Sequence, residues 1–339
     1  MVDNLFIACY NEVVQKSKNT LKGGVYILNY NIIEVQSQEI LPHIAEKMRY
    51  KTELLPYISK AYIKRYKHLK GKNEAEKEII RRANNRIENL KNCSTNIFTD
   101  EEGNILASNS CHQRLCPICN YKKSTITWHK INSIVEMLPD KKWILITLTV
   151  KNVKSKQLDN AINSMLKSFR RMINRNTWKK SIKGGFRSLE VTYNAEKDSY
   201  HPHIHILCCV DSDYFTTEKY IDFDELRQMW QQSAKLDYHC NVDIRAIKEA
   251  EKKNAVAEVA KYAVELSSVL EGNITAKRQE AIETIFHSIH GRRLIAMFGA
   301  VKAKAKELLI DLDSEEESTT GTMKYFIEWT GNRYEKKNI

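Results

Sequence analysis

The sequence predicts an α+β fold in which helices come first and an antiparallel sheet follows. A charged helical pattern fills residues 39–90, and a β-branched run of strand length, WILITLTV, occupies residues 143–150. Two hairpin patterns lie on either side of that run. The 339 residues suit two or three domains, and a hydrophobic content of 42% is enough for a core.

The individual elements follow from local patterns. Residues 74–91 place Ile79, Ala83 and Ile87 at helical spacing. Residues 158–173 form an amphipathic helix whose apolar side excludes Arg170 and Arg171. The other expected elements are a hairpin with its turn near Gly103, a hairpin of residues 187–193 and 203–209, helices over 222–234 and 255–270, and a strand pair near the end of the chain.

Composition shifts divide the chain into four expected segments. Residues 1–92 form a helical region that either faces DNA or presents a solvated charged surface. Residues 93–130 hold a cysteine cluster, residues 140–310 hold the sheet domain, and residues 311–339 form an acidic linker and tail. Lysine and arginine number 54 against 42 acidic residues, a net charge of +12 that favours a nucleic-acid partner.

The strongest local feature is the segment SYHPHIHILCCV. In a strand, His203 and His205 project to the same face, so their imidazoles can converge on one cation. If residues 187–193 pair with this strand, Glu190 shares that face. Two histidines and one carboxylate leave open metal positions for water or substrate oxygens. An isolated His-x-His is often only structural, and the carboxylate opposite it is what favours a metal site.

A second candidate metal site is the cysteine cluster. Cys93, Cys111, Cys116 and Cys119 supply four thiolates, and the CPIC spacing is typical of a zinc knuckle. Four thiolates form a closed tetrahedral site, which is structural rather than catalytic. His112 and His129 are competing ligands, and Cys93 departs from the usual pattern because it stands outside a second Cys-x-x-Cys.

A tyrosine on a helix completes the chemistry. Glu258 and Tyr262 are four residues apart in NAVAEVAKYAVEL and therefore share a helical face. Beside a His-x-His metal site on a basic protein, a phenol is a candidate nucleophile for a DNA phosphodiester. Because the phenol has a pKa of ~10, it needs a metal to polarise the phosphate.

These motifs together resemble the rolling-circle replication initiators of Gram-positive plasmids, which belong to the HUH endonuclease superfamily. The resemblance runs from about Cys93 to about Leu309 and includes, in family order, CHQRLCPIC, ILITLTV, HPHIHIL behind LEVTYN, EVAKY, and GRRLIAMFGAVKAKAKEL. It implies a central antiparallel sheet with flanking helices, the histidines on a middle strand, and a zinc-ribbon-like unit before it.

The resemblance also implies roles for individual residues. His203 and His205, with Glu190 as third ligand, would hold Mg²⁺ or Mn²⁺, and the cysteine cluster would hold structural Zn²⁺. Tyr262 would nick one strand of the plasmid origin, keep a 5′-phosphotyrosine and free a 3′-hydroxyl primer, while Glu258 would activate water to end the cycle. The expected DNA contacts are Tyr262, Lys261, Arg170, Arg171, Arg292 and Arg293.

One position departs from the family pattern. Relatives usually carry a lysine three residues after the tyrosine, and here that position is Glu265, whose carboxylate cannot neutralise phosphate charge. The departure favours an alternative, a non-catalytic zinc-ribbon DNA-binding protein. Another alternative is a transposase or mobilisation relaxase, although several transposases use two tyrosines and this helix has only Tyr262.

The expected partners follow from the same reasoning. The sequence has no GxxxxGK[ST] motif, so unwinding and synthesis would come from a host helicase and polymerase. A homodimer is compatible with the sequence. We expect a cytoplasmic protein without membrane contact, because no apolar run reaches ~20 residues and the first residues lack a secretory pattern.

Overall fold

The computed structural model describes residues 37–101, 105–261, 275–314 and 323–338. Gly103, Tyr262 and Glu265 therefore lie outside the described residues, as does much of the region 1–92. The chain packs as two compact units. The first contains the described parts of Met1–Pro56, Gly71–Cys119 and Glu315–Ile339, and the second contains Tyr57–Lys70 and Asn120–Ser314.

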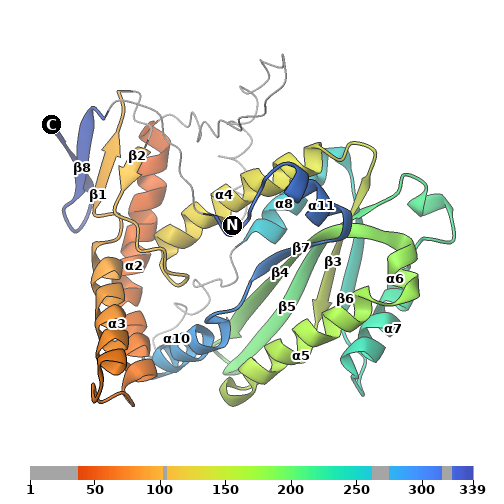
Figure 1. Cartoon of the computed structure of the whole chain (residues 1–339), viewed down its shortest axis with the longest axis horizontal. Coiled ribbons are helices and arrows are strands. Elements are labelled where there is room, and N and C mark those ends of the chain that lie inside the picture. The colour runs from red at the N-terminus through yellow and green to blue at the C-terminus, as the bar shows by residue number, and fades with distance from the viewer. Residues whose placement is uncertain (1–36, 102–104, 262–274, 315–322, 339) are drawn as a thin grey trace. The chain divides into compact units, whose positions relative to one another are not determined.

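The first unit combines two helices with a four-stranded antiparallel sheet (Figure 1). Strand β1 pairs with β2, which confirms the predicted hairpin, and β8 pairs with β9, which confirms the strand pair near the end of the chain. Strand β1 also pairs with β8, so residues far apart in sequence share one sheet. The elements are α2 (Ser37–Tyr66, shared with the second unit), α3 (Glu74–Asn92), β1 (Asn96–Thr99), β2 (Ile105–Ser108), β8 (Tyr325–Trp329) and β9 (Tyr334–Asn338).

The second unit is built on a five-stranded antiparallel sheet in the order β6-β3-β5-β4-β7. The predicted strand at residues 143–150 is an inner strand, and the histidine-bearing strand is the middle one. The strands are β3 (Lys142–Thr149), β4 (Ile182–Asn194), β5 (Ser199–Val210), β6 (Val242–Ile247) and β7 (Ile295–Phe298). Mixed helices and antiparallel sheets therefore confirm the α+β class.

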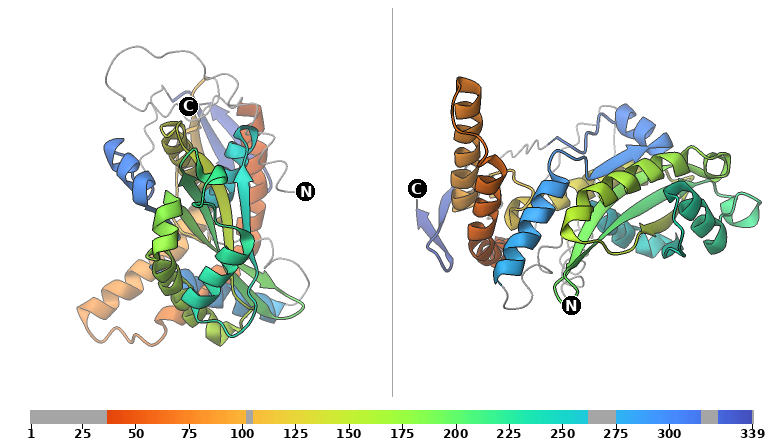
Figure 2. Two further views of the ribbon diagram at one scale, coloured as in Figure 1. Left: turned by 90° about the vertical axis from the view of Figure 1, so that its right-hand side faces the viewer. Right: turned by 90° about the horizontal axis from the view of Figure 1, so that it is seen from below.

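Helices cover both faces of this sheet. The amphipathic helix α5 packs on β5 and buries Leu158, Ile162 and Phe169, while α8 packs on the opposite face of β4 and β5 (Figures 1 and 2). The helices are α4 (Pro117–Glu136, shared with the first unit), α5 (Ser155–Ile173), α6 (Asn176–Ser181), α7 (Phe223–Ala234), α8 (Lys252–Ala260), α10 (Thr275–Ile289) and α11 (Gly299–Glu307), with 3₁₀ turns η1 (Tyr214–Thr216) and η2 (Glu249–Glu251). None of the described helices is long and apolar enough to cross a membrane.

Alternation along β5 places its side chains on two different faces. Ile204 and Ile206 are fully buried on the face that α5 covers, and His203 and His205 point the other way. The predicted helix 255–270 is wrong as one continuous helix: α8 lies on the histidine face and ends at Ala260, because its C-cap Lys261 has a non-helical ψ of 129°. The expectation that Glu258 and Tyr262 share one helical face therefore does not hold. The sheet therefore separates an apolar core from a polar face on which chemistry can take place.

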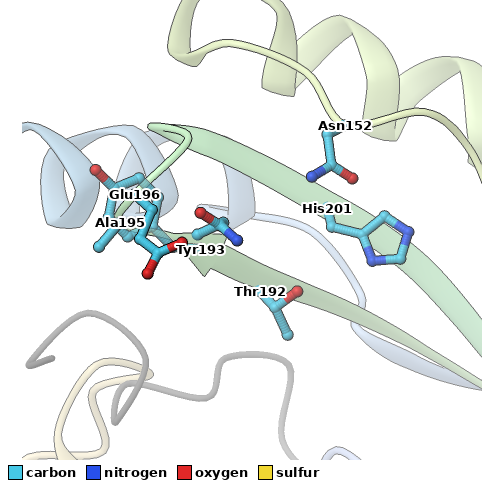
Figure 3. A pocket seen from close by; sticks show the side chains of 7 residues that line it. Asn152, Thr192, Tyr193, Ala195, Glu196 and His201 are labelled. Carbon is cyan, nitrogen blue, oxygen red and sulfur yellow. The ribbon is translucent and has the colours of Figure 1, made fainter.

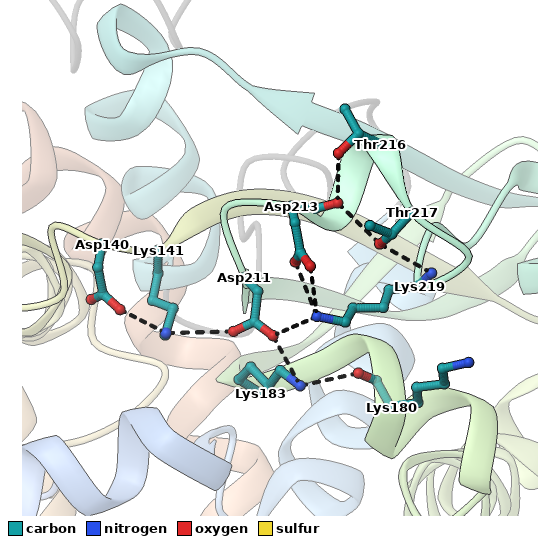
Figure 4. Close-up of polar contacts among 9 residues, drawn as sticks. All are labelled: Asp140, Lys141, Lys180, Lys183, Asp211, Asp213, Thr216, Thr217 and Lys219. Atoms are coloured by element: carbon teal, nitrogen blue, oxygen red, sulfur yellow. Dashed lines mark hydrogen bonds and ion pairs between the residues drawn. The ribbon is translucent and has the colours of Figure 1, made fainter.

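An ion-pair cluster centred on Asp211 lies directly after Val210, the last residue of β5 (Figure 4). Lys141, Lys183 and Lys219 place their Nζ atoms 3.5, 3.1 and 3.3 Å from carboxylate oxygens of Asp211. All three ammonium groups thus pair with the carboxylate of Asp211. Lys219 also pairs with Asp213. We therefore interpret this cluster as a structural network at the turn after β5.

Candidate active site

The described face of the sheet brings two histidines and one carboxylate together. Strand register pairs Glu190 with His203 across β4 and β5. The Nε2 atoms of His203 and His205 each lie 3.1 Å from Oε2 of Glu190. All three ligand atoms lie within 4.8 Å of one another, and both histidines are only 9% exposed. The face expected from sequence alternation thus forms a triad, Glu190–His203–His205.

Hydrogen bonds behind the triad fix the orientation of both imidazoles. Nδ1 of His203 lies 3.1 Å from the carbonyl oxygen of His201, and because a carbonyl only accepts, Nδ1 carries the proton. Nδ1 of His205 lies 3.2 Å from Oγ1 of Thr147 on β3. Both Nε2 atoms therefore face Glu190, the arrangement that metal-binding histidines adopt when a second group holds the other ring nitrogen.

The carboxylate and the imidazole of His203 stabilise each other's charge. Burial alone would raise the pKa of Glu190, but hydrogen bonds from His203 and His205 outweigh it and hold this pKa well below its usual range. Burial alone would lower the pKa of His203, whereas the hydrogen bond and charge of Glu190 raise it. The two shifts favour positive charge on His203 beside the negative charge of Glu190 when no metal is bound.

Helix α8 adds a second carboxylate to this face. Oε1 of Glu258 lies 3.6 Å from Nε2 of His205, and its Oε2 lies 3.1 Å from Nζ of Lys261. Oγ of Ser188 donates to the carbonyl oxygen of Lys261 at 3.4 Å, and Ser188 is paired with His205 across the sheet. The backbone at Lys261 thus lies against the strand that flanks the triad. Tyr262, the next residue, is outside the described residues.

The second group of ligand atoms is the cysteine cluster of the first unit. The Sγ atom of Cys93 lies 3.4 Å from that of Cys119 and 3.6 Å from that of Cys116, and Cys111 lies 3.6 Å from Cys119. The four thiols are free rather than disulfide-bonded. Neither His112 nor His129 belongs to this group. Of the ligand sets that the sequence left open, the geometry brings together the four cysteines.

These distances fit a tetrahedral zinc ion. A Zn–S bond of ~2.3 Å requires sulfurs about 3.8 Å apart, close to the observed separations. A backbone N–H also donates to the cluster, from Cys111 to Sγ of Cys93 at 3.4 Å. Buried thiolates need such donors because the protein interior solvates charge poorly.

A lysine that the sequence analysis did not single out lies beside the cysteines. Lys51 of α2 is only 3% exposed, and its Nζ donates to the carbonyl oxygens of Lys91 and Cys93, each at 2.8 Å. Burial lowers the pKa of Lys51, and the negative charge of the four cysteines opposes that shift. Lys51 therefore ties α2 to the loop that carries Cys93.

Comparison with known proteins agrees with the sequence resemblance. The family model for Replication protein (Rep_1) matches residues 102–335. The chain belongs to this family. It is 33% identical to a "Protein rep" of Streptococcus pneumoniae serotype 2 over 66% of this chain and 72% of that protein. It is also 33% identical to a "Replication protein" of Staphylococcus aureus over 55% of this chain and 81% of the relative.

A "Protein rep" from a Bacillus species is 35% identical over 58% of this chain and 71% of the relative. No solved structure matches the chain. The likeness to plasmid replication initiators of Gram-positive bacteria is thereby confirmed, and the family match includes the triad, three of the four cysteines, and Glu258.

The arginines predicted to contact DNA do not join the triad. Arg171 donates to the carbonyl oxygen of Ser233, and Arg292 forms ion pairs and hydrogen bonds with Asp159 and Asn163 of α5. Arg293 pairs with Asp313 at 2.7 Å, and Arg170 is exposed on α5. Of the described residues predicted to bind DNA, only Lys261 lies beside the site, so DNA contact by the four arginines stays a prediction.

Thr147 and His201 are additional residues at the site, and both carried a sequence signal. Thr147 shares strand parity with Thr149 in the threonine-rich strand, and register pairs it with His205. His201 shares the parity of His203, and their rings lie 5.1 Å apart with an angle of 27° between them. Ser188 also has the parity of Glu190. These assignments required knowing which strands are neighbours.

Proposed function

We propose that this chain initiates rolling-circle replication by nicking one strand at a plasmid origin through an HUH-type active site. The observation that carries the proposal is the convergence of the triad and Glu258 on one face of the sheet, in a chain that belongs to a family of replication proteins. A basic net charge of +12 supports a DNA partner, and salt should weaken its binding.

In this proposal Glu190, His203 and His205 bind Mg²⁺ or Mn²⁺. The donor set fits a cation with open positions, because two imidazole nitrogens and one carboxylate oxygen occupy only part of its coordination sphere. When bound, the cation supplies polarisation of the non-bridging phosphate oxygens and orients the phosphate. Thr147 and the carbonyl of His201 keep the two rings facing the ion.

The nucleophile in this proposal is the phenol of Tyr262. Its oxygen bonds to phosphorus, the bond from phosphorus to the 3′ oxygen breaks, and that oxygen leaves as a 3′-hydroxyl after gaining a proton. The phenol loses its own proton in the same step. The 5′-phosphate stays on the tyrosine, and rejoining is the reverse transfer onto a 3′-hydroxyl.

The position of Glu258 suits a general base at the end of the cycle. Its carboxylate lies 3.6 Å from His205, and Lys261 neutralises part of its charge. A carboxylate there can take a proton from water that attacks the phosphotyrosine. The carbonyl oxygen of Lys261, the residue before Tyr262, accepts a hydrogen bond from Ser188, which pairs with His205 across the sheet.

We further propose that the four cysteines hold a structural Zn²⁺, as their spacing and burial support. A host helicase and polymerase would supply unwinding and synthesis. The four arginines named above and the region 1–92 stay candidates for origin recognition.

A comparison of wild type with Tyr262→Phe on a supercoiled plasmid carrying the origin tests the proposal. With Mg²⁺ or Mn²⁺, wild type should convert supercoiled to nicked DNA and the variant should not, because phenylalanine lacks the attacking oxygen. Tyr220→Phe, which alters an exposed tyrosine far along the chain, should nick like wild type. Equal nicking by wild type and Tyr262→Phe would remove Tyr262 from the mechanism.

A second candidate function is DNA binding without cleavage. Glu265 favours it, because the family resemblance implies a lysine at that position and a carboxylate cannot neutralise phosphate charge. In that case the wild type would bind origin DNA and never nick it, whereas Glu265→Lys would gain nicking activity. A transposase or mobilisation relaxase with the same chemistry would instead nick DNA at a site other than a replication origin.

A further inference from the structure

A pocket of about 630 Å³ lies at the end of β4 and β5 where Thr192 pairs with His201 (Figure 3). Register pairs Thr192 with His201, one side-chain position beyond the pair formed by Glu190 and His203. Side chains two residues apart on a strand are separated by ~6.6 Å. The pocket therefore begins one step along the strands from the triad. Its lining residues are Asn152, Thr192, Tyr193, Asn194, Ala195, Glu196 and His201.

The lining chemistry does not suit a phosphate. None of the seven residues is lysine or arginine, and Glu196 adds a negative charge. The pocket offers two side-chain amides, the hydroxyls of Thr192 and Tyr193, a carboxylate and an imidazole, and the Tyr193 hydroxyl already donates to Asp198. These groups recognise base edges: amides can pair with adenine, carboxylates accept from the amino group of cytosine, and flat rings such as histidine stack on unpaired bases.

The walls of the pocket are held in place before any ligand binds. Asn152 donates to Oγ of Ser199 at 3.2 Å, and the neighbouring Val153 exchanges two backbone hydrogen bonds with Tyr200. On the other side, Oδ1 of Asn194 accepts from the backbone of Lys197 at 2.7 Å. A preorganised pocket loses little conformational entropy when it binds a ligand, so modest polar contacts can discriminate between ligands.

His201 connects the pocket to the triad. Its ring lies against that of His203, and its carbonyl oxygen accepts the proton of Nδ1 of His203. A ligand that contacts the imidazole of His201 therefore lies next to the imidazole of His203, which belongs to the triad. If a DNA phosphate reacts at the triad, the nucleotide next to that phosphate would therefore reach the pocket.

We propose that the pocket binds the base of a nucleotide next to the cleaved phosphate, and so contributes to the choice of nick site. The inference rests on the proposed nicking function. Asn152 and Glu196 read the edge of the base, and His201 contacts its flat face. The phosphates stay outside the pocket, where Lys197 is exposed; the ammonium group of Lys154 donates to the carbonyl oxygens of Lys197 and Asp198.

The test is a cleavage profile on single-stranded DNA. The full chain with Mn²⁺ is given a pool of oligonucleotides that carry a randomised window, and the cleaved products are sequenced to obtain the base preference at each position. Asn152→Ala removes an amide and Glu196→Gln removes a carboxylate. Both residues are exposed, and both are proposed to contact the edge of the base. Glu218→Gln, an exposed carboxylate beyond the other end of β5, is the matched control.

We expect wild type and Glu218→Gln to share one profile. The two pocket variants should lose about tenfold of their base preference at one position next to the nick and keep the preferences at the other positions. Unchanged profiles in both variants would overturn the inference, as would a uniform loss of rate with no change in preference. No cleavage by wild type would instead count against the nicking function itself.

Discussion

The cysteine cluster of the first unit and the triad of the second both gather ligand atoms within 4.8 Å, but they differ in what surrounds those atoms. Four thiols satisfy a tetrahedral ion completely, and three of them are buried. The triad supplies three ligand atoms, lies one side-chain position along the strands from two residues that line a pocket, and has a further carboxylate from α8 beside it.

From this contrast we infer that the cysteine cluster would hold a fold together and that the triad would perform chemistry. The cysteines come from a helix end, a loop and the start of α4, so an ion there links three segments. The triad comes from two paired strands that are already held by their hydrogen bonds. Loss of the first ion should therefore unfold structure, whereas loss of the second should remove activity from a folded protein.

The largest expected effect is on the fold of the first unit. Cys116→Ser should release zinc and unfold this unit, because structural zinc contributes about 10–16 kcal/mol, comparable with the whole stability of a domain. Zinc content by mass spectrometry and resistance to proteolysis would measure this. Cys240→Ser changes a buried cysteine outside the cluster, so this variant should keep the zinc that the four cluster cysteines bind. A stable, zinc-free Cys116→Ser protein would mean that the site is not structural.

The next effect is on activity without loss of fold. His203→Ala or His205→Ala should lower origin nicking by about 10²-fold or more, because a metal ligand is removed, and the strands should stay paired. Nicking rates and circular dichroism would be compared with His239→Ala, an exposed histidine outside the triad. Nicking at the wild-type rate by both triad variants would show that the triad is not needed.

A smaller effect concerns the lysine beside the cysteines. Lys51→Met keeps the length of the side chain but removes its charge and the hydrogen bonds to the loop of Cys93. We expect zinc affinity to fall about 10- to 100-fold, as when groups behind metal ligands are removed. Competition with a coloured chelator would measure it. Lys47→Met changes a partly exposed lysine one turn earlier on α2 and should bind zinc like wild type. If Lys47→Met lowers zinc affinity as much as Lys51→Met, the hydrogen bonds of Lys51 are not the cause.

The smallest effect is a shift in titration of the metal-free triad. Glu190 has a lowered pKa and His203 a raised one because they pair with each other. The stabilisation from Glu190 is lost as pH falls through its folded pKa, and that from His203 is lost as pH rises through its folded pKa. The pair should therefore stabilise the protein most in between.

Glu190→Gln should lower the pKa of His203, since the carboxylate that raised it is gone. Histidine ring signals followed by NMR against pH would show the change. If His203 titrates at the same pH in both proteins, the ion pair does not form in solution.

Local patterns predicted much of this molecule. Alternation placed His203, His205 and Glu190 on one face, and register now pairs Glu190 with His203. The amphipathic helix α5 and both hairpins also followed from local spacing. These features depend on neighbours within a few residues or across one turn, which sequence spacing records directly.

Long-range neighbours were beyond the reach of local patterns. Lys51 contacts Cys93 from 42 residues away, and nothing around Lys51 marks it among the many lysines of its helix. The pairing of β1 with β8 joins segments about 230 residues apart. Thr147 could be assigned to His205 only once β3 and β5 were known to be adjacent.

The most direct measurement identifies the residue that becomes linked to DNA. After reaction with origin DNA and Mn²⁺, the covalent protein–DNA product would be digested with protease and nuclease and the modified peptide sequenced by mass spectrometry. We predict a nucleotide joined through its 5′-phosphate to Tyr262. A linkage at another side chain, or nicked DNA with no protein attached, would contradict it.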